Sequence, residues 1–354
     1  MRDVLSDWGP VVDEAIAEIL PREIDRQYLT EFFGEATYQY EPDSVQDGMS
    51  EPIWDLLDRG GKRWRPVVFL VLVEAFGYDP EEYLPYATIP EVLHSGTIIV
   101  DDVEDDATMR RGDDALHLRY GKDVALNAGN AMYFLPLKII THNPGDLDGP
   151  TRLAAYEMLM DELNRTHIGQ GMDIRWHNDE RVEVTEEEYL EMSACKTGCL
   201  GRIVARLAAI VTNQPEEVQH HVAKYAEMMS IAFQIGDDIL DIENSLDMAG
   251  DFGKEFGNDI REGKKTLMVI HAVEQAEAER AERLEEILWA DENTDEEIME
   301  AIEILQETNS IDYARDRALT LAAQARDHLD AVDLAPEPAG NLAEFTRFVV
   351  ERDS

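Results

Sequence analysis

Two groups of aspartates have the spacing of a metal site. Both follow the pattern D-D-x-x-D, and together they consist of Asp101, Asp102, Asp105, Asp237, Asp238 and Asp241. On a helix, residues i and i+4 share a face, so the carboxylates of each group converge over about one turn. Cations stabilise such clustered like charges, and carboxylate oxygens suit Mg²⁺, which also binds substrate phosphates. We therefore expect the two groups to face each other across one pocket and to hold magnesium and a diphosphate.

The alternative reading of each triplet is a solvated, acidic helix face. That reading is strong in a chain with 76 acidic and 31 basic residues. The sequence around the triplets opposes it, because each one ends an aliphatic stretch that we expect to be a buried helix, within residues 96–105 and 232–241. Charged side chains at the ends of buried helices are costly unless an opposite charge or a metal ion pairs with them.

Basic residues stand beside both acidic groups. Each could be a surface charge, and a lone histidine is more often a packed core residue. Collectively they predict two anion sites beside a metal site, as an enzyme that handles two diphosphates requires. They are Lys62, Arg65, His94, Arg110, Arg111, Lys196, Lys254 and Lys264.

The elements that must position these residues all have helical periodicity. Apolar stretches too long for typical strands cover residues 66–76, 124–140, 153–174, 189–211 and 222–242, and amphipathic helices are expected over 265–332 and 341–350. Glycine and proline mark turns near 59–61, 112–113, 143–149 and 250–263. We predict an all-α protein, with no strand and no nucleotide-binding glycine loop.

Length and composition indicate one large helical domain. The 354 residues contain no linker-like tract or repeat, and 44% of them are hydrophobic, enough for a sizeable core. We expect a single domain over 1–354, with the motifs in about 50–270 and an acidic helical part over 270–354. A formal charge of −45 opposes binding to nucleic acid or anionic lipid, and is typical of proteins from a salt-rich cytosol.

The remaining features predict a cytoplasmic protein. No secretory signal or apolar run long enough to span a membrane is visible. Cys195 and Cys199 lie four residues apart, so we expect two packing residues in a reducing compartment rather than a disulfide or a zinc site.

The ordered motifs resemble those of the trans-polyprenyl diphosphate synthase family, of the geranylgeranyl diphosphate synthase type. In chain order they are GGKRWRP, EVLHSGTIIVDDVEDDATMRRG, HIGQGMD, KTG, FQIGDDILD and GKEFGNDIREGKKT, within residues 60–266. Asn130 departs from the aspartate that many relatives carry there, which affects the subtype more than the activity. The resemblance implies an isoprenoid-synthase-like fold, which is a single large helical bundle with a deep central cavity, and a homodimer. It also implies head-to-tail condensation of isopentenyl diphosphate with an allylic diphosphate, with three Mg²⁺ ions in each site.

The resemblance also implies individual roles. Asp101, Asp105 and Asp237 would bind Mg²⁺ directly, with Asp102, Asp238 and Asp241 in support. Thr197 and Gln234 would place oxygens near the allylic cation, and Lys196 would act beside them. The allylic diphosphate would be held by Arg110, Lys196, Lys254 and Lys264, and isopentenyl diphosphate by Lys62, Arg65, His94 and Arg111. No side chain is an obvious general base, so the released diphosphate is expected to take the final proton.

Product length should depend on the small residues Gly96 and Thr97, which precede Asp101 by five and four positions. Farnesyl-type members carry an aromatic side chain there, which forms the floor of the tail pocket and stops chain growth. Its absence predicts a longer product, geranylgeranyl diphosphate. Met132, Tyr133 and Phe134 are candidates for a deeper floor or for plain core. A geranylfarnesyl or longer product, or a farnesyl product, remains the alternative.

Three other functions compete with this interpretation: two other enzyme classes and a non-catalytic subunit. A terpene cyclase would lack a second full aspartate triplet and the isopentenyl site, and a head-to-head synthase would carry D-x-x-x-D in both places. A non-catalytic subunit of a heteromeric synthase would typically have lost one triplet, whereas both are intact here. Turnover by the purified chain alone distinguishes an enzyme from such a partner.

Overall fold

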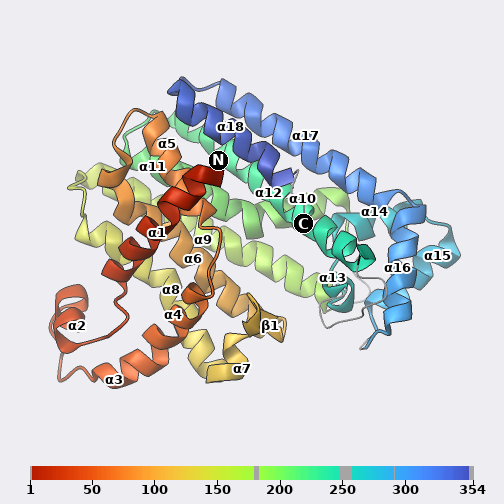
Figure 1. The fold of residues 1–354 in the computed structure, drawn as a ribbon, viewed down its shortest axis with the longest axis horizontal. Helices are drawn as coiled ribbons and strands as arrows, with labels where there is room; N and C mark the ends of the chain where they lie inside the picture. The colour runs from red at the N-terminus through yellow and green to blue at the C-terminus, as the bar shows by residue number, and fades with distance from the viewer. Residues whose placement is uncertain (1, 179–182, 248–256, 291, 351–354) are drawn as a thin grey trace. The chain divides into compact units, whose positions relative to one another are not determined.

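The computed structural model describes residues 2–178, 183–247, 257–290 and 292–350 (Figure 1). Helices account for almost all of its regular structure, and one short two-stranded ribbon is the exception among these residues. The prediction of an all-α protein is confirmed. Within the described ranges no helix is both long and apolar enough to cross a membrane.

The chain forms two compact units. The first comprises Met1–Leu159, Ile203–Gln219 and Leu334–Leu342, and the second comprises Met160–Arg202, His220–Asp333 and Ala343–Ser354. Each unit contains one of the two aspartate groups. The expectation of a single domain stays a prediction.

The elements of the first unit follow one another from the N-terminus to the middle of the chain. They are α1 (Arg2–Ile19), α2 (Arg26–Phe33), α3 (Pro42–Val45), the π-helical turn η1 (Gln46–Ser50), α4 (Glu51–Asp58), α5 (Trp64–Ala75), the 3-10 turn η2 (Pro80–Tyr83), α6 (Leu84–Glu104), β1 (Met109–Arg110), β2 (Asp113–Asp114), α7 (Leu116–Tyr120) and α8 (Lys122–His142).

The second unit holds most of the remaining elements. They are α10 (Glu186–Ser193), the π-helical turn η3 (Ala194–Gly198), α13 (Asn258–Arg261), α14 (Leu267–Gln275), α15 (Ala278–Leu288), α16 (Asp295–Glu307) and α17 (Ser310–Asp330). Four helices contribute residues to both units: α9 (Gly149–His177), α11 (Cys199–Val211), α12 (Glu216–Asp247) and α18 (Pro336–Val350).

Helix α5 forms the centre of the first unit. It is apolar on every side, and its residues from Trp64 to Val73 are all buried, as expected for a helix enclosed by others. Arg63 caps its start in the left-handed conformation and donates hydrogen bonds to Asp13, Glu91 and the Leu57 carbonyl. The GGKRWRP motif thus brings its cations to the N-terminus of a buried helix.

Helices α6 and α8 pack closely against each other in the first unit. Two glycines permit the close approach. A Cβ on Gly96 would lie 2.8 Å from Met132 Cβ, and a Cβ on Gly129 would lie 2.9 Å from Val100 Cγ2. Since neither position has room for a side chain, this contact fixes the course of α6 and therefore the location of its acidic end.

Threonine caps define several helix starts in the second unit. Thr185 and Thr294 form capping boxes with Glu188 and Glu297, as their sequence spacing favours. Thr266 accepts a hydrogen bond from Val269 N at the start of α14, so the GKKT segment places its lysines just before a helix N-terminus.

Three local features differ from the sequence prediction. The second aspartate triplet does not end its helix, because α12 continues to Asp247; only the first triplet ends one, with Asp105 as the C-cap of α6. The helix expected over 189–211 contains the π-helical turn η3. The turn expected at 112–113 closes a short antiparallel ribbon, which the sequence did not predict.

Both cysteines are buried free thiols, as predicted. Burial raises the pKa of Cys199 to about 12, so this thiol is protonated at neutral pH and acts as a small packing group.

Candidate active site

The first aspartate group lies at the C-terminal end of α6. Asp102 is buried, and its Oδ1 accepts from Arg110 Nε at 2.8 Å and Arg110 Nη2 at 2.5 Å. Burial raises the pKa of Asp102, and Arg110 opposes that rise. Asp101 and Asp105 are half-buried and thus more accessible than Asp102. The accessible Asp101 and Asp105 suit metal ligands that meet a substrate. The buried Asp102 suits a carboxylate that orients Arg110.

A cluster of positive charge surrounds His94 on the same helix. Burial lowers the pKa of His94 well below its usual value, and the nearby arginines Arg65, Arg111, Arg110 and Arg63 lower it further. Its Nδ1 atom is buried and has no hydrogen-bond partner among the residues that the structure describes. Neutral histidine beside several arginines can donate to an anion, and a diphosphate would offset the local positive charge. Lys62, also predicted here, is exposed.

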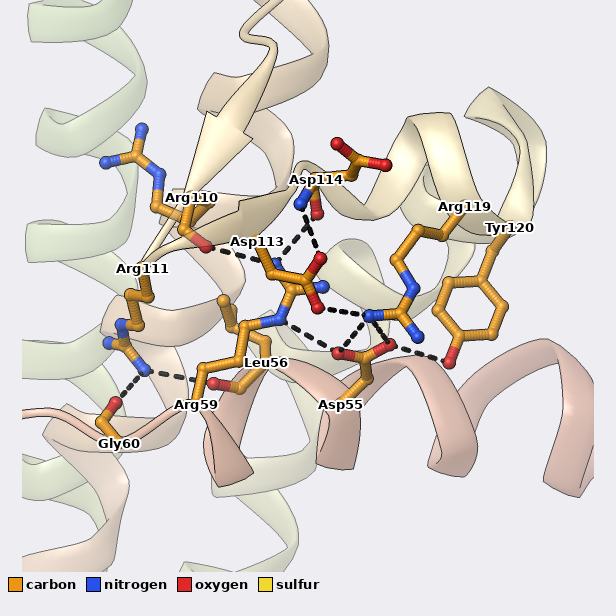
Figure 2. Close-up of polar contacts among 10 residues, drawn as sticks. All are labelled: Asp55, Leu56, Arg59, Gly60, Arg110, Arg111, Asp113, Asp114, Arg119 and Tyr120. Carbon is orange, nitrogen blue, oxygen red and sulfur yellow. Dashed lines mark hydrogen bonds and ion pairs between the residues drawn. The ribbon is translucent and has the colours of Figure 1, made fainter. Parts of the chain in front are cut away.

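The ribbon of β1 and β2 carries Arg110 and Arg111 (Figure 2). Its two-residue turn consists of Arg111 and Gly112, with φ of 53° and 77°, as in the type I′ turns of tight hairpins. The Arg111 guanidinium donates to the carbonyls of Leu56 at 3.2 Å and Gly60 at 2.6 Å (Figure 2). Arg111 is therefore held against the end of α4 and the glycines of the GGKRWRP motif.

The second aspartate group lies on α12. Asp238 is buried; its Oδ2 accepts from the Tyr189 hydroxyl at 3.2 Å and its Oδ1 from Gln234 Nε2 at 2.9 Å. Burial and the neighbouring Asp259 raise the pKa of Asp238 well above its usual value. The same two causes raise the pKa of Asp241 to about 6. Asp237 is half-buried beside them.

The π-helical turn η3 presents Lys196 and Thr197 in the same unit. Lys196 Nζ lies 2.6 Å from Asp173 Oδ2, and Thr197 Oγ1 donates to Gln234 Oε1 at 3.4 Å. Gly169 of α9 allows the close packing, because a Cβ there would lie 2.4 Å from Lys196 N. Thr197, Gln234 and Asp238 thus form one chain of hydrogen bonds. The expectation that Thr197 and Gln234 place oxygens near the allylic cation stays a prediction. Single-turn π-helices are frequent at functional sites.

The lysines after the second triplet are only partly described. Lys264 Nζ lies 3.2 Å from Asp259 Oδ1 and 2.5 Å from Glu262 Oε2. Lys254 lies outside the described residues, so its predicted role stays a prediction. The same holds for the expectation that both aspartate groups share one pocket.

The chemistry of the second aspartate group fits a divalent cation. Burial raises the pKa values of Asp238, Asp241 and Asp259, and neighbouring carboxylates raise each of them further, so a bound cation would stabilise their charged forms. Within the described ranges, no group of three or more acidic, histidine or cysteine side chains is arranged to hold an ion. Water and substrate oxygens would therefore have to complete the coordination, as is usual for Mg²⁺.

These raised pKa values predict that the metal-free protein gains stability on mild acidification. The folded pKa of Asp241, about 6, exceeds the usual 3.8, so the folded state holds the proton more tightly. The destabilisation by the ionised Asp241 carboxylate is absent below about pH 4 and complete above about pH 7. At pH 7 we expect Asp241→Asn to unfold at higher urea concentration than the wild type in EDTA, by on the order of 1–2 kcal/mol. This difference should shrink at pH 5; a pH-independent difference would contradict the charge argument.

Several residues of this site were not singled out from the sequence. Asp173 and Asp259 lie within the HIGQGMD and GNDIREGKKT motifs, and their position in those motifs was the available signal. Tyr189, Asp55 and Arg59 gave no such signal, because their contacts join segments distant in the chain.

Comparison with known proteins identifies the family of this chain. The model of the polyprenyl synthetase family matches residues 46–305. The chain is 32% identical to a geranylgeranyl pyrophosphate synthase of Geoglobus acetivorans, over 99% of both chains. It is also 32% identical to a geranylfarnesyl diphosphate synthase of Natronomonas pharaonis, over 84% of this chain and 88% of the relative.

A solved structure extends the likeness to the fold. A geranylgeranyl pyrophosphate synthetase of Pyrococcus horikoshii superimposes with a TM-score of 0.84 at 28% identity, over 99% of both chains. Such agreement over the whole length confirms the expected fold class and enzyme class. The chain belongs to the polyprenyl synthetase family and is a prenyltransferase.

Proposed function

We propose that this enzyme condenses isopentenyl diphosphate with an allylic diphosphate, head to tail, and that its main product is geranylgeranyl diphosphate. The observation that carries the proposal is the cluster of positive charge around His94. It gives the first unit an anion site in addition to its aspartate group, and a terpene cyclase has no use for a second diphosphate.

Each diphosphate would use a different set of side chains. We propose that isopentenyl diphosphate is held by Lys62, Arg65, His94 and Arg111. The allylic diphosphate would be held by Arg110, Lys196, Lys254 and Lys264. Arg110 would then have to divide its donors between Asp102 and the substrate.

We propose that Mg²⁺ binds to both aspartate groups, three ions in a complete site, and neutralises charge on the leaving diphosphate. Arg110 and Lys196 would stabilise the same charge while the allylic C–O bond breaks. The oxygens of Thr197 and Gln234 would lie near the allylic cation. The isopentenyl double bond, held in place by its own diphosphate, would attack C1, and the released diphosphate would remove the final proton.

The tail of the product would run along α6, away from Asp101. Thr97 is half-buried, and its hydroxyl donates to the His94 carbonyl at 2.7 Å. Gly96 contacts α8, so an aromatic residue there would displace that helix, and Thr97 offers the cleaner test. Met132 and Tyr133 are buried, whereas the Phe134 side chain is 67% exposed and does not belong to the core of this chain.

The assay is product analysis with isopentenyl diphosphate, farnesyl diphosphate and Mg²⁺ in high salt. We expect geranylgeranyl diphosphate; no product beyond farnesyl would reject the length argument. Geranylfarnesyl diphosphate is the second candidate, because a relative of equal identity is a geranylfarnesyl diphosphate synthase.

Thr97→Phe should shorten the product. A phenyl ring at this position fills the space that the tail would occupy, so we expect the ratio of farnesyl to geranylgeranyl product to rise at least about 10-fold when growth starts from geranyl diphosphate. Thr97→Ser keeps the small size and should leave the ratio unchanged. If Thr97→Phe made the same product as the wild type, the tail would run elsewhere.

We further propose that the enzyme works as a homodimer in the cytoplasm, which the family resemblance supports. Light scattering in high salt tests the dimer.

A further inference from the structure

The ribbon that carries Arg110 and Arg111 is too short to hold its own conformation. Each strand has two residues, and isolated two-stranded hairpins are marginal in water. Its turn is also strained, because Arg111 has a φ of 53°, where glycine, asparagine or aspartate is preferred. Such strain persists only when surrounding contacts impose it.

Arg59 supplies these contacts from the end of α4. Its Nη1 atom donates to the carbonyls of Arg110 at 3.0 Å and Asp114 at 2.8 Å, one on each strand of the ribbon (Figure 2). The Arg59 side chain is only 7% exposed. A buried guanidinium with two donors to opposite strands fixes both sides of the turn at once.

Asp55 lies one helical turn before Arg59 and orients the Arg59 side chain. Its carboxylate accepts from Arg59 Nε at 2.8 Å and from the Tyr120 hydroxyl at 2.8 Å (Figure 2). Arg119 lies 3.3 Å from Asp55 and 2.6 Å from Asp113, so it ties the same carboxylate to the second strand. Burial and the bond to Asp55 raise the pKa of Tyr120 to about 12, so the hydroxyl stays a donor at neutral pH.

We propose that Arg59, oriented by Asp55, is a positioning residue for both diphosphates. It holds the backbone of Arg110 and of the turn at Arg111, so that each guanidinium stands where its substrate arrives. This inference rests on the proposed function. Neither Arg59 nor Asp55 belongs to one of the sequence motifs. The contacts that define the role of Arg59 are with backbone carbonyls 51 and 55 positions further along the chain.

The test is Arg59→Met, which keeps the length and the apolar packing but removes every donor. We expect KM for both diphosphates to rise about 10-fold or more, with a smaller change in kcat, because misplaced binding groups lose affinity before chemistry. Amide hydrogen exchange across residues 109–115 should accelerate at least about 10-fold, while exchange in α5 stays slow. Asp55→Asn should change both readouts in the same direction by less, and it serves if Arg59→Met fails to fold.

Asp58→Asn is the matched control. It removes the exposed pair between Arg22 and Asp58 from the same helix, without a contact to the ribbon. We expect wild-type KM values and wild-type exchange. Wild-type KM values in Arg59→Met would overturn the inference, as would an acceleration of exchange spread evenly over the first unit.

Failure of the proposed function gives a different result. If the wild type does not condense the two diphosphates, the proposed function is wrong. Amide exchange of the ribbon in Arg59→Met would still show whether Arg59 holds the ribbon in place. If the wild type is active and Arg59→Met is equally active with equal KM, only the inference is wrong.

Discussion

Asp101→Ala is expected to abolish condensation while leaving the fold intact. We propose that Asp101 carries Mg²⁺ at the end of α6, where it is half-buried, and that the charge on the departing diphosphate depends on that ion. Loss of one ligand for the metal should reduce kcat by about 10³-fold or more. The measurement is steady-state turnover at saturating Mg²⁺, together with circular dichroism to show that the helices are retained.

Asp106→Asn is the control for this substitution. Asp106 is the next aspartate after the triplet, its side chain is 75% exposed, and it pairs with Lys122 rather than with a residue of the first aspartate group. Asparagine also tolerates the left-handed backbone at this position, where φ is 48°. Exposed pairs of this kind contribute little to stability, so both turnover and melting should stay near wild type. Comparable activity of Asp101→Ala and Asp106→Asn would refute the assignment of Asp101 to the metal.

Arg202→Met is expected to cause the largest loss of stability. Arg202 in α11 is 11% exposed and forms ion pairs with Glu162 at 2.7 Å and Glu227 at 2.6 Å. Its Nη1 atom also donates to the Ala194 carbonyl at 3.0 Å, at the start of the π-helical turn η3. Removing the guanidinium takes the arginine partner from the buried Glu162 and the half-buried Glu227, while Lys224 stays paired with Glu227. We expect the free energy of unfolding to fall by about 3–5 kcal/mol in urea titrations.

A second variant separates charge from packing. Glu162→Gln and Glu227→Gln added to Arg202→Met remove the uncompensated charges, so the triple variant should regain much of the lost stability. Arg280→Met provides the exposed comparison, because Arg280 is 32% exposed and pairs with Glu307 at the surface of the same unit. We expect a loss below about 1 kcal/mol there. Equal losses for Arg202 and Arg280 would mean that burial does not govern the effect.

Local sequence was sufficient for the elements and for most candidate residues. Apolar periodicity predicted the all-α class, and the D-D-x-x-D spacing placed Asp101 and Asp105 on one face of a single helix end. Glycines at 60, 61 and 112 marked turns that have positive φ values. These features depend on residues a few positions apart, so the chain encodes them directly.

Long-range contacts were not predictable in the same way. The sequence predicted that both triplets end their helices, but α12 continues past Asp241, since no glycine or proline follows before Gly250. It also gave no reason to expect the π-helical turn at Lys196, which Arg202 and Gly169 support from other parts of the second unit.

The sequence alone therefore determined which chemistry this protein can carry, because spacing along a helix decides which carboxylates and cations share a face. Tertiary structure decided how each group is held and charged. Arg59 binds carbonyls more than fifty positions away, and burial near Asp259 raises the pKa of Asp238. Burial and distant partners are properties of the folded chain, so no local pattern contains them.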